Sequence, residues 1–233
     1  MKLVIMQPYF MAYCGYWQLL NSADKFVIYD DVNYIKQGWI NRNRLLVNKK
    51  PCFMTLPLKD ASPFKKIKNI ELIDTNWREK ILKTIKNTYA KSIYFHEVYP
   101  ALESIINFSS NNLADYVANS IVEVAGLLQM DTQIVRSSSI YMNDMMSAQE
   151  RVLDICKQES ADIYINAPGG RALYSFKEFS NAGIELKFIS CPMVEYKQNS
   201  DEFTPYLSII DQLMSTGIEA VKSNLDNYSL ESS

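Results

Sequence analysis

The 233-residue sequence has few of the residues on which many catalytic and cofactor sites depend. It contains one histidine, His96, which excludes mechanisms and metal sites that need two or more histidines. Its seven glycines include no G-x-G-x-x-G sequence, so the dinucleotide-binding fingerprint is missing. Its four cysteines form no C-x-x-C pair, which argues against a zinc site and against a small disulfide framework.

Long apolar runs and an excess of positive charge are missing as well. No stretch reaches the roughly 18 consecutive apolar residues of a membrane span, and the first residues lack the small-residue cleavage site of a signal peptide. The formal net charge is −2, so no overall basic field attracts nucleic acid or anionic lipid. We therefore expect a cytoplasmic protein with a small-molecule substrate, without a membrane span or a nucleic-acid partner. A homo-oligomer remains open.

The chain does have a large apolar content, 48%, and no repeat or linker interrupts it. This composition predicts one α/β domain over residues 1–233. An apolar run at 3–7, a helical pattern from Gly15 to 23 and a second apolar run at 25–32 have the size of a strand, helix, strand unit, whose strands are nearly always parallel. Further strands are predicted at 52–58, 67–73, 162–166 and 184–189, and a strand that runs into a loop at 131–141.

Helix signals complete the predicted fold. Residues 75–128 read as a mostly helical insertion, because apolar residues recur there at helical spacing. Capping boxes are expected at Ser147 with Glu150 and at Ser175 with Glu178. Thr204 is expected to cap the last helix, and the tail from 229 is expected to fray. The predicted class is a Rossmann-like, largely parallel sheet flanked by helices.

Ligands of open α/β sheets bind beyond the carboxyl ends of the strands, so the segment after residues 3–7 is the first candidate site. The expected helix start at Gly15 offers free backbone N–H groups and the positive end of the helix dipole, which suit a phosphate. Packing in the core is the alternative role for the aromatic residues here. The side chains that could donate hydrogen bonds to a ligand are Gln7, Tyr9, Tyr13 and Tyr16.

A second cluster occupies residues 29–44, "YDDVNYIKQGWINRNR". Asp30 and Asp31 could act as a base or hold a magnesium ion shared with nucleotide phosphates, and a solvated turn is the alternative. In a strand they would face opposite sides, so one of them at most would enter a site. The guanidinium of Arg42 suits a phosphate or carboxylate, whereas Arg44 is expected at the surface. The other candidate binding residues of this cluster are Lys36, Trp39, Asn41 and Asn43.

Later segments supply the remaining candidates. Asn166, Gly169 and Gly170 follow the strand at 162–166, where the glycine pair could cradle an anion or form a tight turn. Asp211, in an apolar helix, is an internal hydrogen-bond partner or a site residue, and Gln198 is a further candidate for binding. His96 is a structural residue or a general base. Cys14 has no histidine nearby in the sequence, which disfavours covalent cysteine catalysis.

Several segments resemble the WbqC-like protein family in the same order along nearly the whole chain. They are "QPYFMAYCGYWQLLNSADKFVIYDDVNYIKQGWINRNRL", "YINAPGGRALY", "GIELKFI" and "FTPYLSIIDQLMSTG". The resemblance implies a bacterial enzyme of O-antigen or other polysaccharide biosynthesis. The chain departs from the family pattern at Ala12, where proline is usual, and at Asn33, where glutamine is usual. The family's His-Pro-Glu motif has no counterpart here, which weakens an acid/base role for His96.

A weaker pattern is similar to the HIGH-type nucleotidyltransferases. Tyr13-Cys14-Gly15-Tyr16 stands where those proteins have H-x-G-H at a helix start after the first strand. This similarity implies a related fold with a nucleotide bound at the helix, and the loss of histidine-assisted nucleotidyl transfer, because both histidines are tyrosines here.

These observations and resemblances predict a transferase that modifies a nucleotide-activated amino sugar, by acyl or aminoacyl transfer to an amino group. A HIGH-like nucleotidyltransferase or nucleotide-dependent ligase is one alternative. The other is a non-catalytic protein that binds a sugar nucleotide and partners a pathway enzyme. The cofactor considered is a nucleotide with Mg²⁺.

Overall fold

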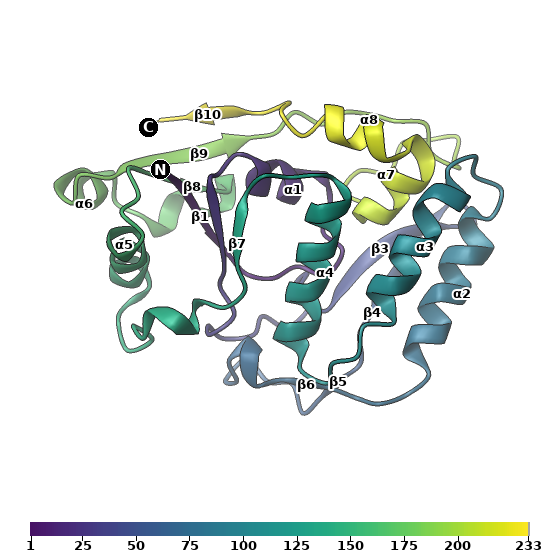
Figure 1. The fold of residues 1–233 in the computed structure, drawn as a ribbon, viewed down its shortest axis with the longest axis horizontal. Helices are drawn as coiled ribbons and strands as arrows, with labels where there is room; N and C mark the ends of the chain where they lie inside the picture. The colour runs from purple at the N-terminus through teal and green to yellow at the C-terminus, as the bar shows by residue number, and fades with distance from the viewer. Residues whose placement is uncertain (233) are drawn as a thin grey trace.

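The computed structural model describes residues 1–232 and has one central sheet of six strands (Figure 1). The sheet order is β10-β9-β8-β1-β2-β7, and every pair is parallel except β10 with β9. Taken in chain order, this is the Rossmann arrangement, in which β1 lies between the second and the fourth strand. The predicted fold class is confirmed. The strands are β1 (Lys2–Met6), β2 (Lys25–Ile28), β7 (Gln133–Val135), β8 (Ile163–Asn166), β9 (Glu185–Ser190) and β10 (Ser229–Glu231).

Helices cover both faces of this sheet, because alternate strand residues point to opposite sides. Val4 and Phe26 face a core shared with α1 (Cys14–Asn21), α4 (Leu113–Leu127), α7 (Ile209–Thr216) and α8 (Ile218–Ser223). Leu3 and Val27 face a second core with α5 (Ala148–Gln158) and α6 (Phe176–Asn181). Burial on both faces explains why β1 and β2 are continuous apolar runs.

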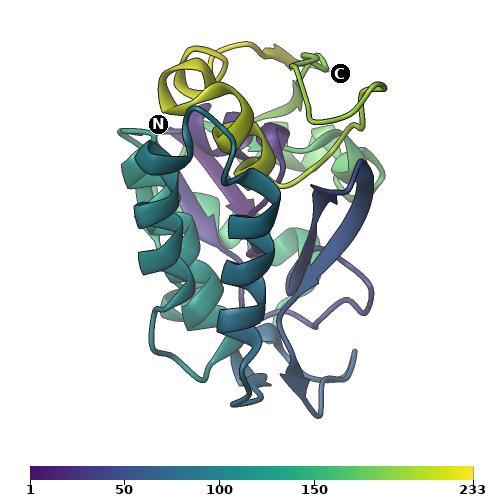
Figure 2. The same cartoon turned by 90° about the vertical axis from the view of Figure 1, so that its right-hand side faces the viewer.

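The chain between β2 and β7 forms an insertion. It begins with the antiparallel hairpin of β3 (Arg42–Val47) and β4 (Lys50–Thr55) and the short pair β5 (Leu58–Lys59) and β6 (Glu71–Leu72), with the 3₁₀ helix η1 (Ile67–Asn69) between them. Helices α2 (Trp77–Tyr89) and α3 (Phe95–Ile106) then lead to α4, which confirms the helical insertion at 75–128. Figure 2 shows the blue hairpin beside the teal helices. Ile85 and Val98 pack into the same core as the sheet.

Several local predictions are wrong. The tail expected to fray contains β10, which pairs with the edge strand β9. Helix α7 begins later than Thr204 indicated, because Ser208 is its N-cap and accepts a hydrogen bond from the backbone of Ile210. The range 67–73, expected as one strand, begins with η1 and contains only the short strand β6, and β3 was not predicted as a strand.

Capping signals were partly correct. The box of Ser147 and Glu150 is present, whereas Ser175 makes no side-chain capping bond. Two 3₁₀ segments complete the chain, η2 (Ser138–Tyr141) after β7 and η3 (Pro168–Leu173) after β8. No helix among residues 1–232 is long and apolar enough to cross a membrane.

Candidate functional site

A pocket opens where the order of the sheet reverses, between the carboxyl ends of β1 and β8. The segments that leave these neighbouring strands pass to opposite faces of the sheet, which leaves a crevice between them. We call this cavity, of about 960 Å³ including its open mouth, the switch-point pocket. Its lining is Met6, Tyr9, Tyr13, Gly15, Tyr16, Leu19, Trp39, Ala167, Pro168, Gly169, Ile189, Cys191 and Tyr206. Six of the predicted binding residues therefore meet here: Tyr9, Tyr13, Gly15, Tyr16, Trp39 and Gly169.

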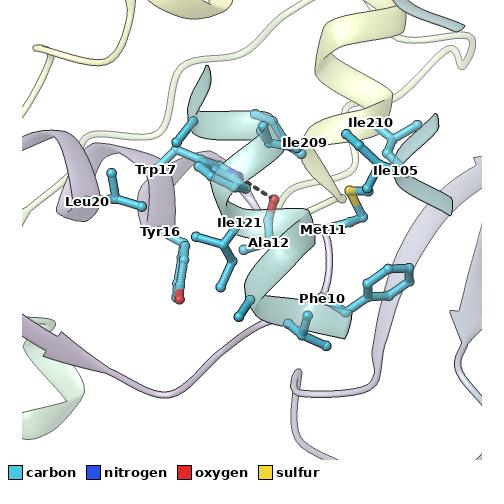
Figure 3. Close-up of a cluster of buried hydrophobic side chains, with 14 of the residues drawn as sticks. Phe10, Met11, Ala12, Tyr16, Trp17, Leu20, Ile105, Ile121, Ile209 and Ile210 are labelled. Carbon is cyan, nitrogen blue, oxygen red and sulfur yellow. Dashed lines mark hydrogen bonds between the residues drawn. The ribbon is translucent and has the colours of Figure 1, made fainter. Parts of the chain in front are cut away.

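The loop between β1 and α1 is fixed from several sides. The carbonyl of Met11, a residue with φ of 45°, accepts hydrogen bonds from Asn43 Nδ2 at 2.8 Å and Ser208 Oγ at 2.8 Å. The carbonyl of Ala12 accepts from the indole N–H of Trp17 at 3.0 Å (Figure 3). Figure 3 also shows these loop residues among isoleucines of α3, α4 and α7. Part of this segment, which includes Phe10, Met11 and Trp17, thus packs in the core. This packing fixes the position of the tyrosines that line the pocket.

Three tyrosines form the wall along the start of α1. The hydroxyl of Tyr16 donates to the carbonyl of Gln7 at 3.1 Å, and its ring lies 5.4 Å from that of Tyr9. The ring of Tyr13 covers Gly15 so closely that a Cβ there would lie 2.6 Å from it, which explains the glycine. Burial raises the pKa of all three tyrosines. Their hydroxyls therefore stay protonated and can act as hydrogen-bond donors.

Two arginines lie beside the pocket next to its tryptophan. The Arg44 guanidinium lies 5.6 Å from the ring of Trp39 and donates to the carbonyls of Pro205 and Tyr206. The Arg42 guanidinium lies 4.4 Å from the ring of Phe53, which itself lies 6.4 Å from Trp39. Within residues 1–232, neither arginine has a carboxylate within 4.0 Å. This side of the pocket therefore has positive charge that no protein carboxylate neutralises directly.

Arg42 itself is partly committed to the protein. Its guanidinium donates to the carbonyls of Gln37 and Gly38, so it braces the turn before Trp39. Arg44, expected at the surface, is half-buried, and its Nε is buried without a partner. Both arginines are thus half-buried beside Trp39 and donate to backbone carbonyls, and the binding role expected for Arg42 stays a prediction.

A second cavity adjoins the switch-point pocket on the far side of Tyr13. It shares Tyr13, Gly15, Cys191 and Tyr206 with that pocket and has a volume of about 500 Å³ including its mouth. Two free thiols line it, and burial raises the pKa of both Cys14 and Cys191 to about 11. Both sulfurs are therefore neutral thiols at neutral pH, which agrees with the expectation against cysteine catalysis.

Asp30 and Asp31 belong to a different cluster at the end of β2. Both lie beyond the strand, which ends at Ile28, so the expectation that they face opposite sides is wrong. Both are buried, and the Ser138 hydroxyl bonds to both carboxylates. Asp31 forms a buried ion pair with Arg151.

The other hydrogen bonds of this cluster are accepted by the carboxylate of Asp30. Its carboxylate accepts from Ser137 Oγ at 2.8 Å and from the backbone N–H of Ser138 at 3.0 Å. Burial raises the pKa of Asp30, against the lowering effect of these hydrogen bonds. The two aspartates are thus not a solvated turn, because both are buried and serines and an arginine contact one oxygen, Oδ1, of each carboxylate. No group of three or more potential metal ligands (His, Cys, Asp or Glu) occurs within residues 1–232.

Several other predicted residues have contacts within the protein. Asn41 donates to the carbonyl of Leu56 at 2.9 Å and accepts from Tyr34. Gln198 bonds both backbone groups of Thr204, and Asn166 accepts from its neighbouring backbone at 2.7 Å beneath Gly170. These amides shape the loops around the site.

Three more candidates lie away from the pocket lining. Asp211 is buried in α7 and accepts from the hydroxyls of Tyr89 at 2.6 Å and Tyr196 at 2.8 Å, so it is an internal hydrogen-bond partner. Lys36 is exposed before Trp39. His96 is exposed in the first turn of α3, within the helical insertion.

Sequence reasoning missed seven of the thirteen lining residues, and two of these seven, Cys191 and Tyr206, have a side chain that can form hydrogen bonds. Cys191 directly follows β9, so its place after a strand was the signal that could have found it. Tyr206, with φ of 57°, reaches the pocket from the segment before α7, and its ring meets that of Tyr13 at 5.6 Å. No local pattern marks Tyr206, because its position depends on contacts with Arg44 and Tyr13.

The sheet order defines a doubly wound α/β protein. Its pocket lies at the switch point, where ligands of such proteins bind. The model of the WbqC-like protein family matches residues 7–223, and the chain belongs to that family. It is also 27% identical over 222 residues to "Uncharacterized protein Rv1507c" of Mycobacterium tuberculosis (strain ATCC 25618 / H37Rv), an alignment that covers 94% of this chain and 95% of that protein. No solved structure matches the chain. The resemblance found in the sequence is confirmed.

Proposed function

We propose that the protein is a cytoplasmic transferase that modifies a nucleotide-activated amino sugar, and that the switch-point pocket binds this substrate. The observation that carries the proposal is the pairing of an aromatic pocket with two arginines that lack carboxylate partners. Aromatic side chains such as Trp39 and Tyr9 suit the faces of a base or sugar. Arg42 and Arg44 supply the charge that attracts a diphosphate.

The lining also indicates which chemistry suits the pocket. It contains no carboxylate, lysine or histidine, so its polar contribution is hydrogen-bond donation from tyrosine hydroxyls and backbone N–H groups. Acyl transfer to a neutral amine fits this set, because the amine is already a nucleophile and the developing oxyanion needs donors. Tyr13, which lies between the two cavities, is the residue best placed to provide such a donor.

In this reaction the amine nitrogen forms a bond to the acyl carbon, and the bond from that carbon to the leaving group breaks. The proton that the nitrogen loses passes to the leaving group. The adjoining cavity beyond Tyr13 would hold the acyl donor, because it is open and has an apolar wall that includes Pro192 and Val194. The two substrates would then meet at the Tyr13 hydroxyl.

A titration of nucleotides and nucleotide sugars, followed by thermal unfolding, tests the binding site. A ligand at 100 times its Kd should stabilise the protein by about 2.7 kcal/mol. We expect Trp39→Ala and Arg44→Ala to weaken binding at least tenfold and His96→Ala, which changes an exposed residue of the insertion, to leave it unchanged. Equal binding by wild type and Trp39→Ala would contradict the site.

Turnover tests the reaction class. With a bound nucleotide amino sugar and a set of acyl and aminoacyl donors, we expect a product whose mass increases by the acyl group. Tyr13→Phe should lower kcat more than it raises KM, because the hydroxyl acts on the oxyanion. Release of pyrophosphate from a nucleoside triphosphate would instead indicate a HIGH-like nucleotidyltransferase. The sequence Tyr13-Cys14-Gly15-Tyr16 resembles the helix start of that class. Binding of the nucleotide sugar without turnover would indicate that the protein is a non-catalytic partner of a pathway enzyme.

A further inference from the structure

An exposed apolar surface with basic residues lies on the insertion and on the segment after β7. Five apolar side chains on it are at least half exposed: Ile35 at 52%, Phe64 at 90%, Ile140 at 64%, Met142 at 90% and Met145 at 94%. Soluble monomers rarely gather large apolar side chains in this way unless the surface has a partner. We call this set the methionine face.

Backbone pairing brings the three segments of this face together. Asn33 and Lys66 form an antiparallel bridge, and the N–H of Tyr34 donates to the carbonyl of Lys65 at 2.9 Å. Ile35 directly follows Tyr34 and Phe64 directly precedes Lys65, so both side chains belong to the two paired segments. Lys66 forms an ion pair with Asp144, and Lys68 donates to the Ser139 hydroxyl at 3.0 Å, so the segment that contains Met142 and Met145 runs beside them.

The exposure of the methionines is imposed by the backbone. Tyr141 and Asn143 are buried on either side of Met142, and Asn143 accepts from Arg151 Nε at 2.8 Å. Met142 itself has φ of 53°, a conformation that costs free energy for a residue with a side chain. Anchors on both sides therefore fix a segment whose apolar side chains point outward.

The charge of this face differs from that of the whole chain. Residues 33–36, 62–68 and 138–146 contain four lysines and one aspartate, a net charge of +3, whereas the chain has a net charge of −2. Lys36 and Lys65 are exposed. The net charge of the whole chain argues against binding to anionic lipid, but the net charge of this face does not.

We infer that the methionine face binds the surface of an anionic membrane. Its apolar residues are exposed and line neither of the cavities described above, so they are available for insertion between lipid headgroups. Its lysines complement acidic headgroups, and each one near such a surface contributes about fivefold in affinity. The face follows the carboxyl ends of β2 and β7, so binding places the edge of the sheet that contains the pocket toward the bilayer.

Co-sedimentation with vesicles tests this inference. We expect the full chain to sediment with vesicles of equal parts phosphatidylglycerol and phosphatidylcholine, not with phosphatidylcholine alone, and to be released by salt. Phe64→Ser with Met142→Ser should lower binding at least tenfold, and Lys36→Glu with Lys65→Glu more than tenfold. The matched controls are Ile93→Ser and Lys91→Glu, which change an exposed isoleucine and an exposed lysine between α2 and α3 and should bind as the wild type.

Three results would overturn the inference. One is no sedimentation with the anionic vesicles, and a second is equal loss of binding in the control variants. The third is a wild-type dimer in light scattering that Phe64→Ser with Met142→Ser dissociates, which would assign the face to a second copy of the chain. Nucleotide-sugar binding in solution should be the same in the wild type and in Phe64→Ser with Met142→Ser, so the result of that variant is independent of the proposed function.

Discussion

Replacing Arg151 by methionine tests whether the aspartates after β2 are structural. Arg151 and Asp31 are 4% and 2% exposed, and their ion pair lies within a network that also contains Asn143. Removing the arginine leaves a buried carboxylate without its counter-charge, which typically costs about 3 to 5 kcal/mol. For a domain of this size that loss corresponds to a decrease of roughly 10 °C in Tm.

A double-mutant cycle isolates the pair. Asp31→Asn and Arg151→Met should each destabilise the protein in urea unfolding, whereas the double variant should lose clearly less than the sum, by about 1 to 3 kcal/mol. The exposed pair Lys59 with Glu71 is the matched control, and its disruption should cost less than about 1 kcal/mol.

The alternative role of Asp31 gives a distinct result. If Asp31→Asn kept the wild-type stability and abolished turnover or nucleotide-sugar binding, Asp31 would act in the site as a base or a metal ligand, as the sequence suggested, and the structural interpretation would be refuted. Losses that add fully in the double variant would refute the ion pair itself. We expect instead lower stability with binding retained under conditions where the variants remain folded.

Two further predictions concern residues behind the pocket. Asn43→Ala removes the donor to the carbonyls of Phe10 and Met11 and should cost about 2 kcal/mol in urea unfolding and weaken ligand binding; unchanged values would show that this amide does not hold the loop. Burial raises the pKa of Asp211 above its usual 3.8, so the folded state binds that proton more tightly than the unfolded chain. The stability of the wild type relative to Asp211→Asn should therefore be highest below pH 3.8 and fall as the pH rises through the raised pKa; a difference independent of pH between the two proteins would contradict this.

The sequence predicted the parts of the fold that depend on local patterns. Apolar runs and helix signals located β1, β2, β8 and the helices of the insertion, because burial on both faces and helical spacing leave a direct trace in the sequence. Strand β3 left no such trace, although the predicted strand at 52–58 overlaps its hairpin partner β4. Arg42, Asn43 and Arg44 are polar on both faces of β3, and what places them is contact with Trp39, Phe53 and the loop before α1.

The site was predictable to the same extent. Residues next to strand ends or a helix start, such as Tyr9, Tyr13 and Gly15, were found because topology alone brings them to the switch point. The roles of Asp30 and Asp31 were not predictable, because Arg151, the partner of Asp31, is 120 residues away in the sequence and Ser137, a partner of Asp30, is 107 residues away. A pair of adjacent acids looks the same in a sequence whether its charge is free for chemistry or neutralised inside the protein.

That neutralisation bears on how the edge of the sheet binds a ligand. Two free carboxylates at the end of β2, beside β1, would repel a diphosphate that approached the switch-point pocket. Instead Arg151 of α5 pairs with Asp31, and Ser137 and Ser138, which follow β7, donate hydrogen bonds to Asp30; none of these three residues lines the pocket. The guanidinium groups of Arg42 and Arg44 beside Trp39 have backbone carbonyls, and no carboxylate, as protein partners. The pairing of Asp31 with Arg151 and the lack of a carboxylate beside these two arginines therefore act in the same direction, because both leave the mouth of the pocket suited to an anion.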